Sequence, residues 1–332
     1  DNINPRIAVS YDNNSAKNGK YFAADREMTI TVTEHNFNAS DVSATVANAK
    51  ATGSVADFAA YLKNSVSWIS DGDVHTAKIH FTTEADYTFD IKYTDKSGRT
   101  NDAVDYGNSV APKAFTLDKT APTNPEIKIG DESVLARGAV AFERFYNNAV
   151  TVKYNVNCDI SGLDNIMYQK VAQVSDYSEN GVWTTYNNSG VTVSPNEKFI
   201  IYFRAEDKSG NVTIVNTVGI VVDDKAPVGE KNAPQIDIKP AEANENGFYN
   251  GDVAVSIGVV DPRYIGADSD VAGYYSGLNK ITYQVRTTDT DAVKDGVLLD
   301  IENGLVAGGI YDSDDLVRSW NGSITIDSAE FN

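Results

Sequence analysis

Residues 117–122 read Leu-Asp-Lys-Thr-Ala-Pro, and residues 222–227 read Val-Asp-Asp-Lys-Ala-Pro, 105 positions further along the chain. Three other motif pairs recur in matching order, with spacings of 103 to 115 positions. They are Asp-Lys-Ser-Gly at 95–98 and 207–210, Ser-Gly-Leu at 161–163 and 276–278, and Phe-Tyr-Asn at 145–147 and 248–250. Self-similarity at one period indicates that a unit of just over 100 residues is repeated three times.

Inside each unit, apolar residues alternate with polar ones. Met28, Ile30 and Val32 alternate with threonines, and the same period of two runs through 150–156 and 253–259. This alternation is typical of half-buried antiparallel strands, and clusters such as Asp-Lys-Ser-Gly are typical of the turns between them. About seven short strands per hundred residues predict an immunoglobulin-like β-sandwich for each unit.

The repeat divides the chain into three expected domains, at 1–119, 120–226 and 227–332. Prolines in the two linkers, among them Pro122 and Pro227, restrict the backbone to extended conformations. We therefore predict an all-β fold of tandem sandwiches arranged as a rod-like row.

One segment of the first domain departs from the strand pattern. In residues 54–64, Ser54 stands where a helix-capping residue is expected, with Asp57 three positions later. Val55, Phe58 and Leu62 then fall on one helical face. The pattern predicts a short helix near 54–64 that closes the core of the first sandwich.

The third domain is expected to lack its last strands. Aligning 190–193 with 322–325 places Phe199 opposite Phe331, so the counterpart of 200–225 does not occur before Asn332. A sandwich without these strands exposes sheet edges. We expect either that the natural protein continues, or that the third domain accepts a strand from another segment.

The composition excludes several classes of partner. The 332 residues hold 28 Lys and Arg against 47 Asp and Glu, a net charge of −19, which disfavours binding to nucleic acid or to an anionic membrane surface. The longest apolar stretch, about Val218–Val222, is far too short to span a membrane, so no direct membrane insertion is expected. The N-terminus also shows no basic and apolar leader.

Motifs for catalysis are missing from the sequence. It contains no nucleophile elbow, no phosphate-binding glycine loop and no paired zinc motif. His75 and His80 are expected on opposite faces of a strand, and Cys158 is interpreted as a small buried residue. We predict no enzyme activity, no catalytic residue, no metal ligand and no cofactor. Acidic loops leave calcium open as an alternative to solvated carboxylates. These loops hold Asp261, Asp268 and Asp270, and Asp312, Asp314 and Asp315.

The ending Phe-Thr-Leu-Asp-Lys-Thr-Ala-Pro at 115–122, preceded by Tyr-Thr-Asp-Lys-Ser-Gly at 93–98, resembles the tandem bacterial Ig-like domains of Gram-positive cell-surface proteins. Residues 26–37 also look like the opening of such a module. The resemblance implies an extracellular location, on the bacterial cell surface or secreted. It also implies a role as stalk, spacer or adhesive head.

Three hypotheses for function follow. The first is a non-enzymatic surface protein fragment that binds a host protein or glycan in cell adhesion, or acts as a stalk. The second is a surface protein that captures host immunoglobulin. The third is a set of spacer modules in a larger extracellular carbohydrate-active enzyme.

A candidate ligand-binding loop lies in the third domain. Four residues between Val156 and Ser161 correspond to sixteen between Val259 and Ser276, an insertion that joins the second and third expected strands. Tyrosines are favoured at binding hot spots, and this end of a variable domain carries recognition loops. A lengthened loop that packs on its neighbour is the alternative. The candidate binding residues are Asp261, Arg263, Tyr264, Asp268, Asp270, Tyr274 and Tyr275.

Overall fold

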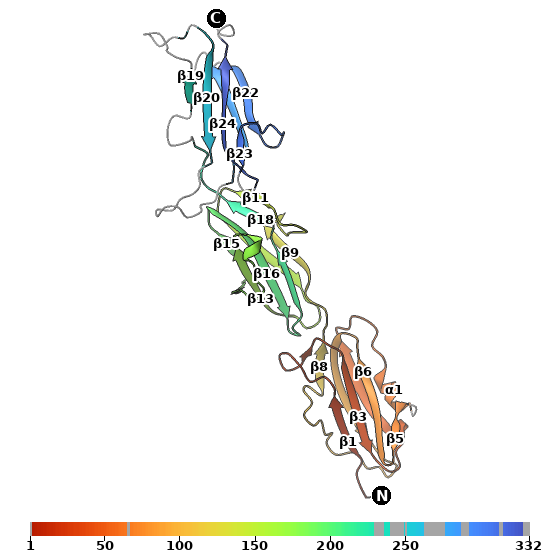
Figure 1. The fold of residues 1–332 in the computed structure, drawn as a ribbon. Coiled ribbons are helices and arrows are strands. Elements are labelled where there is room, and N and C mark those ends of the chain that lie inside the picture. Colours follow the sequence, from red (N-terminus) through yellow and green to blue (C-terminus); the bar gives the residue numbers. More distant parts are fainter. Residues whose placement is uncertain are drawn as a thin grey trace.

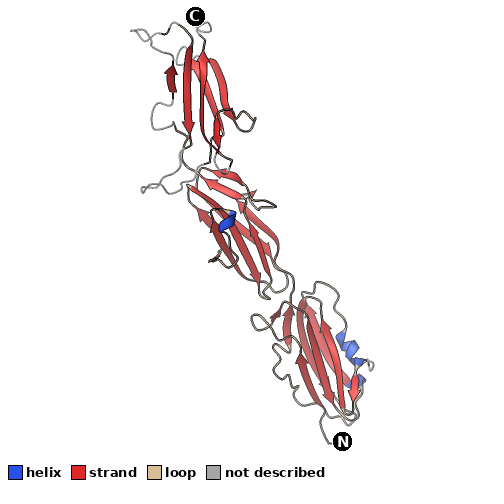
Figure 2. Cartoon of the chain, viewed as in Figure 1, coloured by secondary structure: helices blue, strands red, loops and turns tan. Residues whose placement is uncertain are grey.

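The computed structural model describes residues 2–64, 67–228, 236–239, 249, 251–261, 276–286, 292–311 and 315–327. The described chain forms three groups of β-sheets in a row, with the two chain ends at opposite ends of the molecule (Figure 1). Strands dominate, with short helical pieces in the first two groups (Figure 2). The predicted all-β fold of tandem sandwiches is confirmed. No helix in the described part of the chain is long and apolar enough to cross a membrane.

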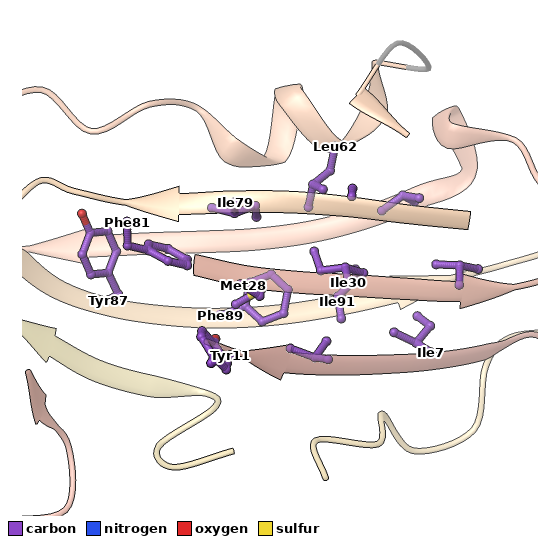
Figure 3. Close-up of a cluster of buried hydrophobic side chains, with 14 of the residues drawn as sticks. Ile7, Tyr11, Met28, Ile30, Leu62, Ile79, Phe81, Tyr87, Phe89 and Ile91 are labelled. Atoms are coloured by element: carbon purple, nitrogen blue, oxygen red, sulfur yellow. The ribbon is translucent and has the colours of Figure 1, made fainter. Parts of the chain in front are cut away.

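We use the name domain 1 for the sandwich formed by β1 to β8. One sheet has the order β1-β3-β6-β5 and the other β2-β8-β7-β4. The first comprises Arg6–Tyr11, Arg26–Thr33, Val74–Phe81 and Ile69–Asp71; the second comprises Tyr21–Phe22, Ala114–Leu117, Ala85–Tyr93 and Val42–Ala49. Side chains from both sheets alternate into a shared core, in which Met28, Ile30 and Val32 are fully buried (Figure 3).

The expected helix in domain 1 is present but starts later than predicted. It is α1, Phe58–Lys63, and its N-cap is Asp57, whose carboxylate accepts a hydrogen bond from the N–H of Ala60 at 2.9 Å. Ser54 was the wrong choice of cap, because the aspartate three positions later takes that role itself. Leu62 is fully buried, so the helix closes the core as expected.

Domain 2 is formed by β9 to β18. One sheet has the order β10-β9-β12-β15 and the other β11-β18-β16-β13-β14, with β17 pairing with β16. The first comprises Glu132–Ser133, Thr123–Ile129, Val150–Asn157 and Val191–Val193. The second comprises Phe142–Tyr146, Gly219–Val222, Glu197–Asp207, Leu163–Val171 and Thr184–Thr185, and β17 is Val212–Asn216. Strand β16 is central, because three strands pair with it.

Domain 3 is formed by β19 to β24. Its first sheet has the order β19-β20-β24-β23, and its second contains β21 and β22. The strands are Ile236–Lys239, Val253–Val260, Val317–Ile326 and Gly309–Tyr311, then Lys280–Arg286 and Ala292–Asp300. Among the described residues, the second sheet therefore has two strands where domain 2 has six.

The strand register corrects the alignment between domains 2 and 3. Val152 lies opposite Val191 in domain 2, and its counterpart Val255 lies opposite Ile324. Val191 therefore matches Ile324, and not Ser323 as the sequence alignment implied. A shift of one residue exchanges the two faces of a strand, so the inward residues of β24 are Ile324 and Ile326.

Candidate functional site: the domain joints

A buried hydrogen bond joins domain 1 to domain 2. Asp118 lies directly after β8, the last strand of domain 1, and its carboxylate accepts from the backbone N–H of Ser161 at 2.9 Å. The other oxygen of this carboxylate accepts from the N–H of Thr120 at 3.1 Å. Asp118 is 1% exposed and Ser161 is 5% exposed. Two of the repeated sequence motifs, Asp-Lys-Thr-Ala-Pro and Ser-Gly-Leu, are thus the two halves of one contact.

The Asp-Lys-Ser-Gly turn of domain 2 completes this joint. Asp207 is fully buried, and one of its carboxylate oxygens accepts from the N–H groups of Ser209, Gly210 and Asn211 at 2.7 to 2.9 Å. Gly210 has φ of 97°, a conformation that glycine adopts without strain. The amide of Asn211 then donates to the backbone carbonyl of Asp118 at 2.9 Å. The turn therefore holds the linker as well as its own loop.

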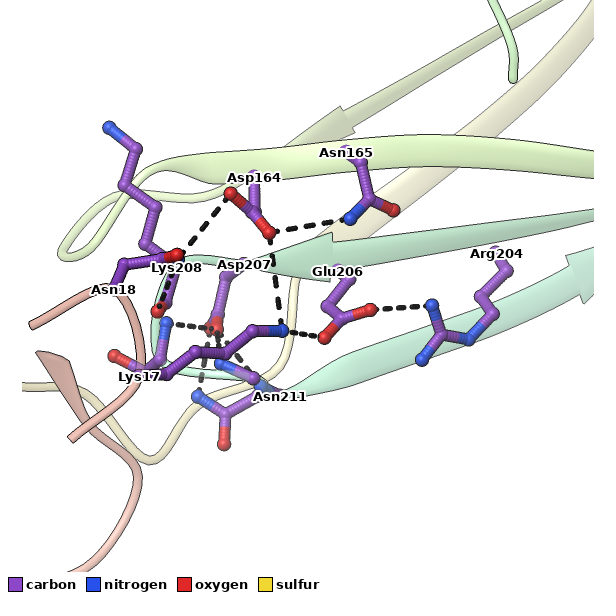
Figure 4. A network of polar contacts seen from close by, with 11 residues as sticks. Lys17, Asn18, Asp164, Asn165, Arg204, Glu206, Asp207, Lys208 and Asn211 are labelled. Atoms are coloured by element: carbon purple, nitrogen blue, oxygen red, sulfur yellow. Dashed lines mark hydrogen bonds and ion pairs between the residues drawn. The ribbon is translucent and has the colours of Figure 1, made fainter. Parts of the chain in front are cut away.

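Further polar side chains, shown in Figure 4, form additional contacts between domains 1 and 2 around this buried joint. Lys17 of domain 1 forms an ion pair with Glu206 of domain 2, which Arg204 also contacts at 2.6 Å. Asn18 donates to the carbonyl of Lys208 at 3.3 Å and to Asp164 at 3.4 Å. These polar contacts connect the loop before β2 to the turns at the near end of domain 2.

Asp118, Cys158 and Asp207 form a cluster with the composition of a metal site. Their potential ligand atoms all lie within 4.8 Å of one another. The carboxylate oxygens, however, already accept hydrogen bonds from N–H donors, which a cation would have to displace. Burial raises the pKa of the Cys158 thiol, and the nearby Asp118 and Asp207 raise it further, so the thiol stays protonated at neutral pH. This arrangement suits a hydrogen-bonded joint better than a metal centre.

The joint between domains 2 and 3 repeats the contact. Asp223 follows β18, and its carboxylate accepts from the backbone N–H of Ser276 at 2.8 Å and from the Ser276 hydroxyl at 3.0 Å. Its other oxygen accepts from the N–H of Lys225 at 2.9 Å. Gly277 has φ of 86°, close to the 79° of Gly162 at the first joint. The same backbone conformation therefore presents the same N–H group at both joints.

The second joint has an aspartate, Asp261, where the first joint has Cys158. Asp261 directly follows β20, the position that Cys158 occupies after β12. It accepts from the N–H of Gly277 at 2.7 Å, is 1% exposed, and has one oxygen with no hydrogen-bond partner. Burial raises the pKa of Asp261 to about 6, and Asp223 nearby adds to this effect. Ionisation of the Asp261 carboxylate at the second joint therefore destabilises the folded state.

Of the predicted ligand-binding residues, only Asp261 lies within the described part of the chain. The structure places it inside the joint and not on an exposed loop. The other members of the set, and the insertion that carries them, lie outside the described residues. They are Arg263, Tyr264, Asp268, Asp270, Tyr274 and Tyr275. The joint residues Asp118, Asp223, Ser161 and Ser276 were not predicted as a site, although the repeated motifs that contain them were the available signal.

Histidines follow the sequence expectation. His75 is buried, stacks on Phe37 at 4.3 Å between ring centroids, and its ring contacts the carbonyl of Glu34 at 2.8 Å. His80 is exposed and contacts Glu27 at 3.1 Å. The two rings therefore lie on opposite faces of β6 and do not share a site.

An aromatic cluster lies on the outer face of domain 2. Tyr177 stacks on Tyr202 with ring centroids 3.8 Å apart, and Trp183 meets Tyr177 edge-on at 6.2 Å. The neighbouring Val182 is 88% exposed. The loop between β13 and β14 thus carries aromatic and aliphatic surface outside the core.

Comparisons with known proteins identify no family for the chain. No protein-family model matches it, and no curated protein sequence matches it. Among solved structures, it is similar to fibronectin(III)-like modules of Clostridium thermocellum CbhA, with 15% identity over 65% of this chain and 94% of that chain and a TM-score of 0.25. It is also similar to the purple acid phosphatase PPD1 of yellow lupin (Lupinus luteus), with 10% identity over 64% of this chain and 40% of that chain and a TM-score of 0.18. At these TM-scores, neither likeness identifies a function.

Proposed function

We propose that the chain is a stiff, non-enzymatic spacer in an extracellular bacterial surface protein. The observation that supports this role is the joint itself. At both joints a buried aspartate at the end of one domain accepts the backbone N–H of a serine in the next domain. Burying a carboxylate is unfavourable unless it is hydrogen-bonded, and the polar groups of a flexible, exposed linker would remain in water instead. The buried aspartates therefore favour a fixed joint over a flexible linker.

Because their hydrogen bonds are buried, these joints resist rotation of one domain relative to the next. A buried N–H that loses its acceptor costs roughly 1–3 kcal/mol, so rotation of one domain against the next breaks a contact that water does not readily replace. Linker prolines restrict the same segments. Such a row holds whatever it carries at a set distance from its anchor, which is the task of a stalk.

Small-angle X-ray scattering of the full chain tests this proposal. Asp118→Ala and Asp223→Ala each remove one buried acceptor, and we expect each variant to show a shorter maximum dimension and a broader distribution of distances. Asp131→Ala is the matched control, because Asp131 is exposed in the turn between β9 and β10. Identical scattering from all four proteins would overturn the proposal.

Adhesion is a second candidate, and the aromatic cluster of Tyr177, Trp183 and Tyr202 favours it. Tyr202 is 7% exposed, whereas the rings of Tyr177 and Trp183 are half-buried and lie beside the exposed Val182. Partly accessible aromatic side chains are common where proteins bind glycans or other proteins. The test is retention of host glycoproteins, including immunoglobulin, on the immobilised chain. A Val182→Asp and Trp183→Ala double variant should lose that retention if this face carries it. Equal retention by the variant would remove this face from consideration.

The same row of domains is also compatible with the third hypothesis, a set of spacer modules in a larger carbohydrate-active enzyme. A catalytic domain elsewhere in the same polypeptide would favour this reading over a surface stalk. Hydrolysis of any polysaccharide by the purified chain would contradict the non-enzymatic proposal in either setting.

A further inference from the structure

Asn18 and Gly19 form the tip of the domain 1 loop that contacts domain 2. The loop is a tight turn, closed by hydrogen bonds between the backbones of Lys17 and Tyr21 at 2.8 and 3.0 Å. Both tip residues are exposed, with φ of 48° and 78°, and a Cβ placed on Gly19 would meet no atom within 4 Å. The backbone N–H of Gly19 thus lies in open space, and no residue in the described part of the chain accepts a hydrogen bond from it.

An asparagine followed by glycine loses its side-chain ammonia more readily than an asparagine followed by any larger residue. Glycine has no side chain to keep its backbone nitrogen away from the amide carbon of the asparagine. A hydrogen bond donated by that nitrogen opposes the attack, because it must first be broken. The state of the glycine N–H therefore distinguishes a reactive pair from a protected one.

The Asn-Gly pairs of this protein differ in this respect. Besides Asn18 and Gly19, the pairs with both residues described end in Gly181, Gly304 and Gly322. The N–H groups of Gly181 and Gly304 donate to backbone carbonyls at 2.9 and 3.2 Å. Gly322 lies inside β24, which is paired with β20. Within the described ranges, the pair at 18–19 alone combines an exposed loop tip with a glycine N–H that is not hydrogen-bonded.

The amide of Asn18 is also a contact between domains. Its nitrogen donates to the carboxylate of Asp164 at 3.4 Å and to the carbonyl of Lys208 at 3.3 Å (Figure 4). Both partners are acceptors, so a carboxylate at position 18 would have no proton to donate and would face a second carboxylate. Lys17 lies 4.0 Å from Asp164 but also pairs with Glu206, so its charge offsets the repulsion only in part.

We propose that Asn18 is a site of spontaneous deamidation, and that the product weakens the contact between domains 1 and 2. The backbone nitrogen of Gly19 attacks the amide carbon of Asn18, its proton passes to the leaving nitrogen, and ammonia departs as a succinimide ring closes. Water then opens the ring to aspartate or isoaspartate. Either product replaces a donor with a negative charge that faces Asp164. The modification does not depend on the spacer role, whereas its effect on the stiffness of the row rests on that proposed function.

Peptide mapping of the full chain tests the modification. After incubation at mildly alkaline pH, mass spectrometry compares deamidation at Asn18 with deamidation at Asn180, an internal control that is also followed by glycine. We expect Asn18 to convert about threefold faster or more, because the N–H of Gly181 must first leave its hydrogen bond. The difference should shrink in urea, where the fold is lost. Conversion of Asn180 as fast as Asn18 in the folded chain would overturn the site.

Variants that mimic the product test the effect on the joint. Asn18→Asp supplies the new carboxylate, Asn18→Ala removes the amide without adding charge, and a double variant combines Asn18→Asp with Asp164→Asn. Hydrogen exchange of the Ser161 amide, which lies in the buried joint, is the readout. We expect exchange about twofold faster in Asn18→Asp than in Asn18→Ala, and a return to the level of Asn18→Ala in the double variant. Equal exchange in the two single variants, or no rescue by Asp164→Asn, would overturn the weakening of the joint, whereas X-ray scattering tests the spacer role separately.

Discussion

Asp223 holds Ser276 by two hydrogen bonds, from the backbone N–H at 2.8 Å and from the hydroxyl at 3.0 Å. The pair connects the end of domain 2 to the start of the second sheet of domain 3. At the first joint, Asp118 holds the backbone N–H of Ser161 in the same way, at 2.9 Å. The same hydrogen bond, from a serine backbone N–H to an aspartate carboxylate, therefore connects the domains at both joints.

Asp118→Ala should destabilise domain 2 by roughly 1–3 kcal/mol, because the buried N–H of Ser161 loses its acceptor. Urea denaturation of the full chain measures this loss, with hydrogen exchange of the Ser161 amide as a local readout. The exposed control Asp131→Ala should stay within about 0.5 kcal/mol of the wild type. Equal effects of the two substitutions would contradict the role assigned to Asp118.

Lys17→Ala should have a much smaller effect, although Lys17 makes a direct ion pair across the first joint. The Lys17 side chain is 36% exposed, so solvent screens the pair and a loss below about 1 kcal/mol is expected. High salt should reduce the difference between variant and wild type. A salt-independent loss larger than that of Asp118→Ala would reverse this ranking.

The stability of domain 3 should depend on pH through Asp261. Its folded pKa is about 6, whereas an unfolded Asp has a pKa near 3.9. Between these values the folded state holds a proton that the unfolded state has lost. The contribution of this group to stability is therefore greatest below about pH 4 and falls by up to about 3 kcal/mol as the pH rises past 6.

Asp261→Asn should remove this dependence, because the side chain stays neutral at every pH. Trp320 is 4% exposed and reports on domain 3 in a Trp68→Phe and Trp183→Phe background. Urea titrations at pH 4.5 and 7.5 compare the two proteins, and the advantage of the Asn variant should grow with pH. A pH slope shared by both proteins would show that Asp261 is not responsible.

Arg26→Lys should destabilise domain 1 although it conserves the charge. Arg26 is 1% exposed, and its guanidinium lies 3.7 to 4.7 Å from the ring centroids of Tyr11, Phe22 and Phe115. It also donates to the carbonyls of Asn13 and Ala111. A lysine cannot reproduce this planar fork, so a loss of roughly 2–4 kcal/mol is expected. Trp68 fluorescence in urea measures it, and a loss below about 0.5 kcal/mol would contradict the prediction.

The alternating pattern and the repeated motifs were enough to predict three β-sandwiches in a row. A period of two specifies which side chains face a core, and this local signal survives in each strand, as in Met28, Ile30 and Val32. A different signal, a capping residue followed by apolar residues on one helical face, located the helix only approximately. Ser54 and Asp57 are both good caps in isolation, and packing of Leu62 against the core selects the register that starts at Phe58.

The joints could not be predicted in the same way. The sequence shows that Asp-Lys-Thr-Ala-Pro and Ser-Gly-Leu each recur, but pairing Asp118 with Ser161 requires two segments 43 positions apart to meet in space. The role of Asp261 has the same origin. As a sequence it is an acidic loop residue, and only the folded joint buries it beside Asp223 and raises its pKa. Local patterning determined which segments form strands and which of their side chains face a core. Tertiary contact, with the loss of solvent that accompanies it, decided which polar residues hold the domains together.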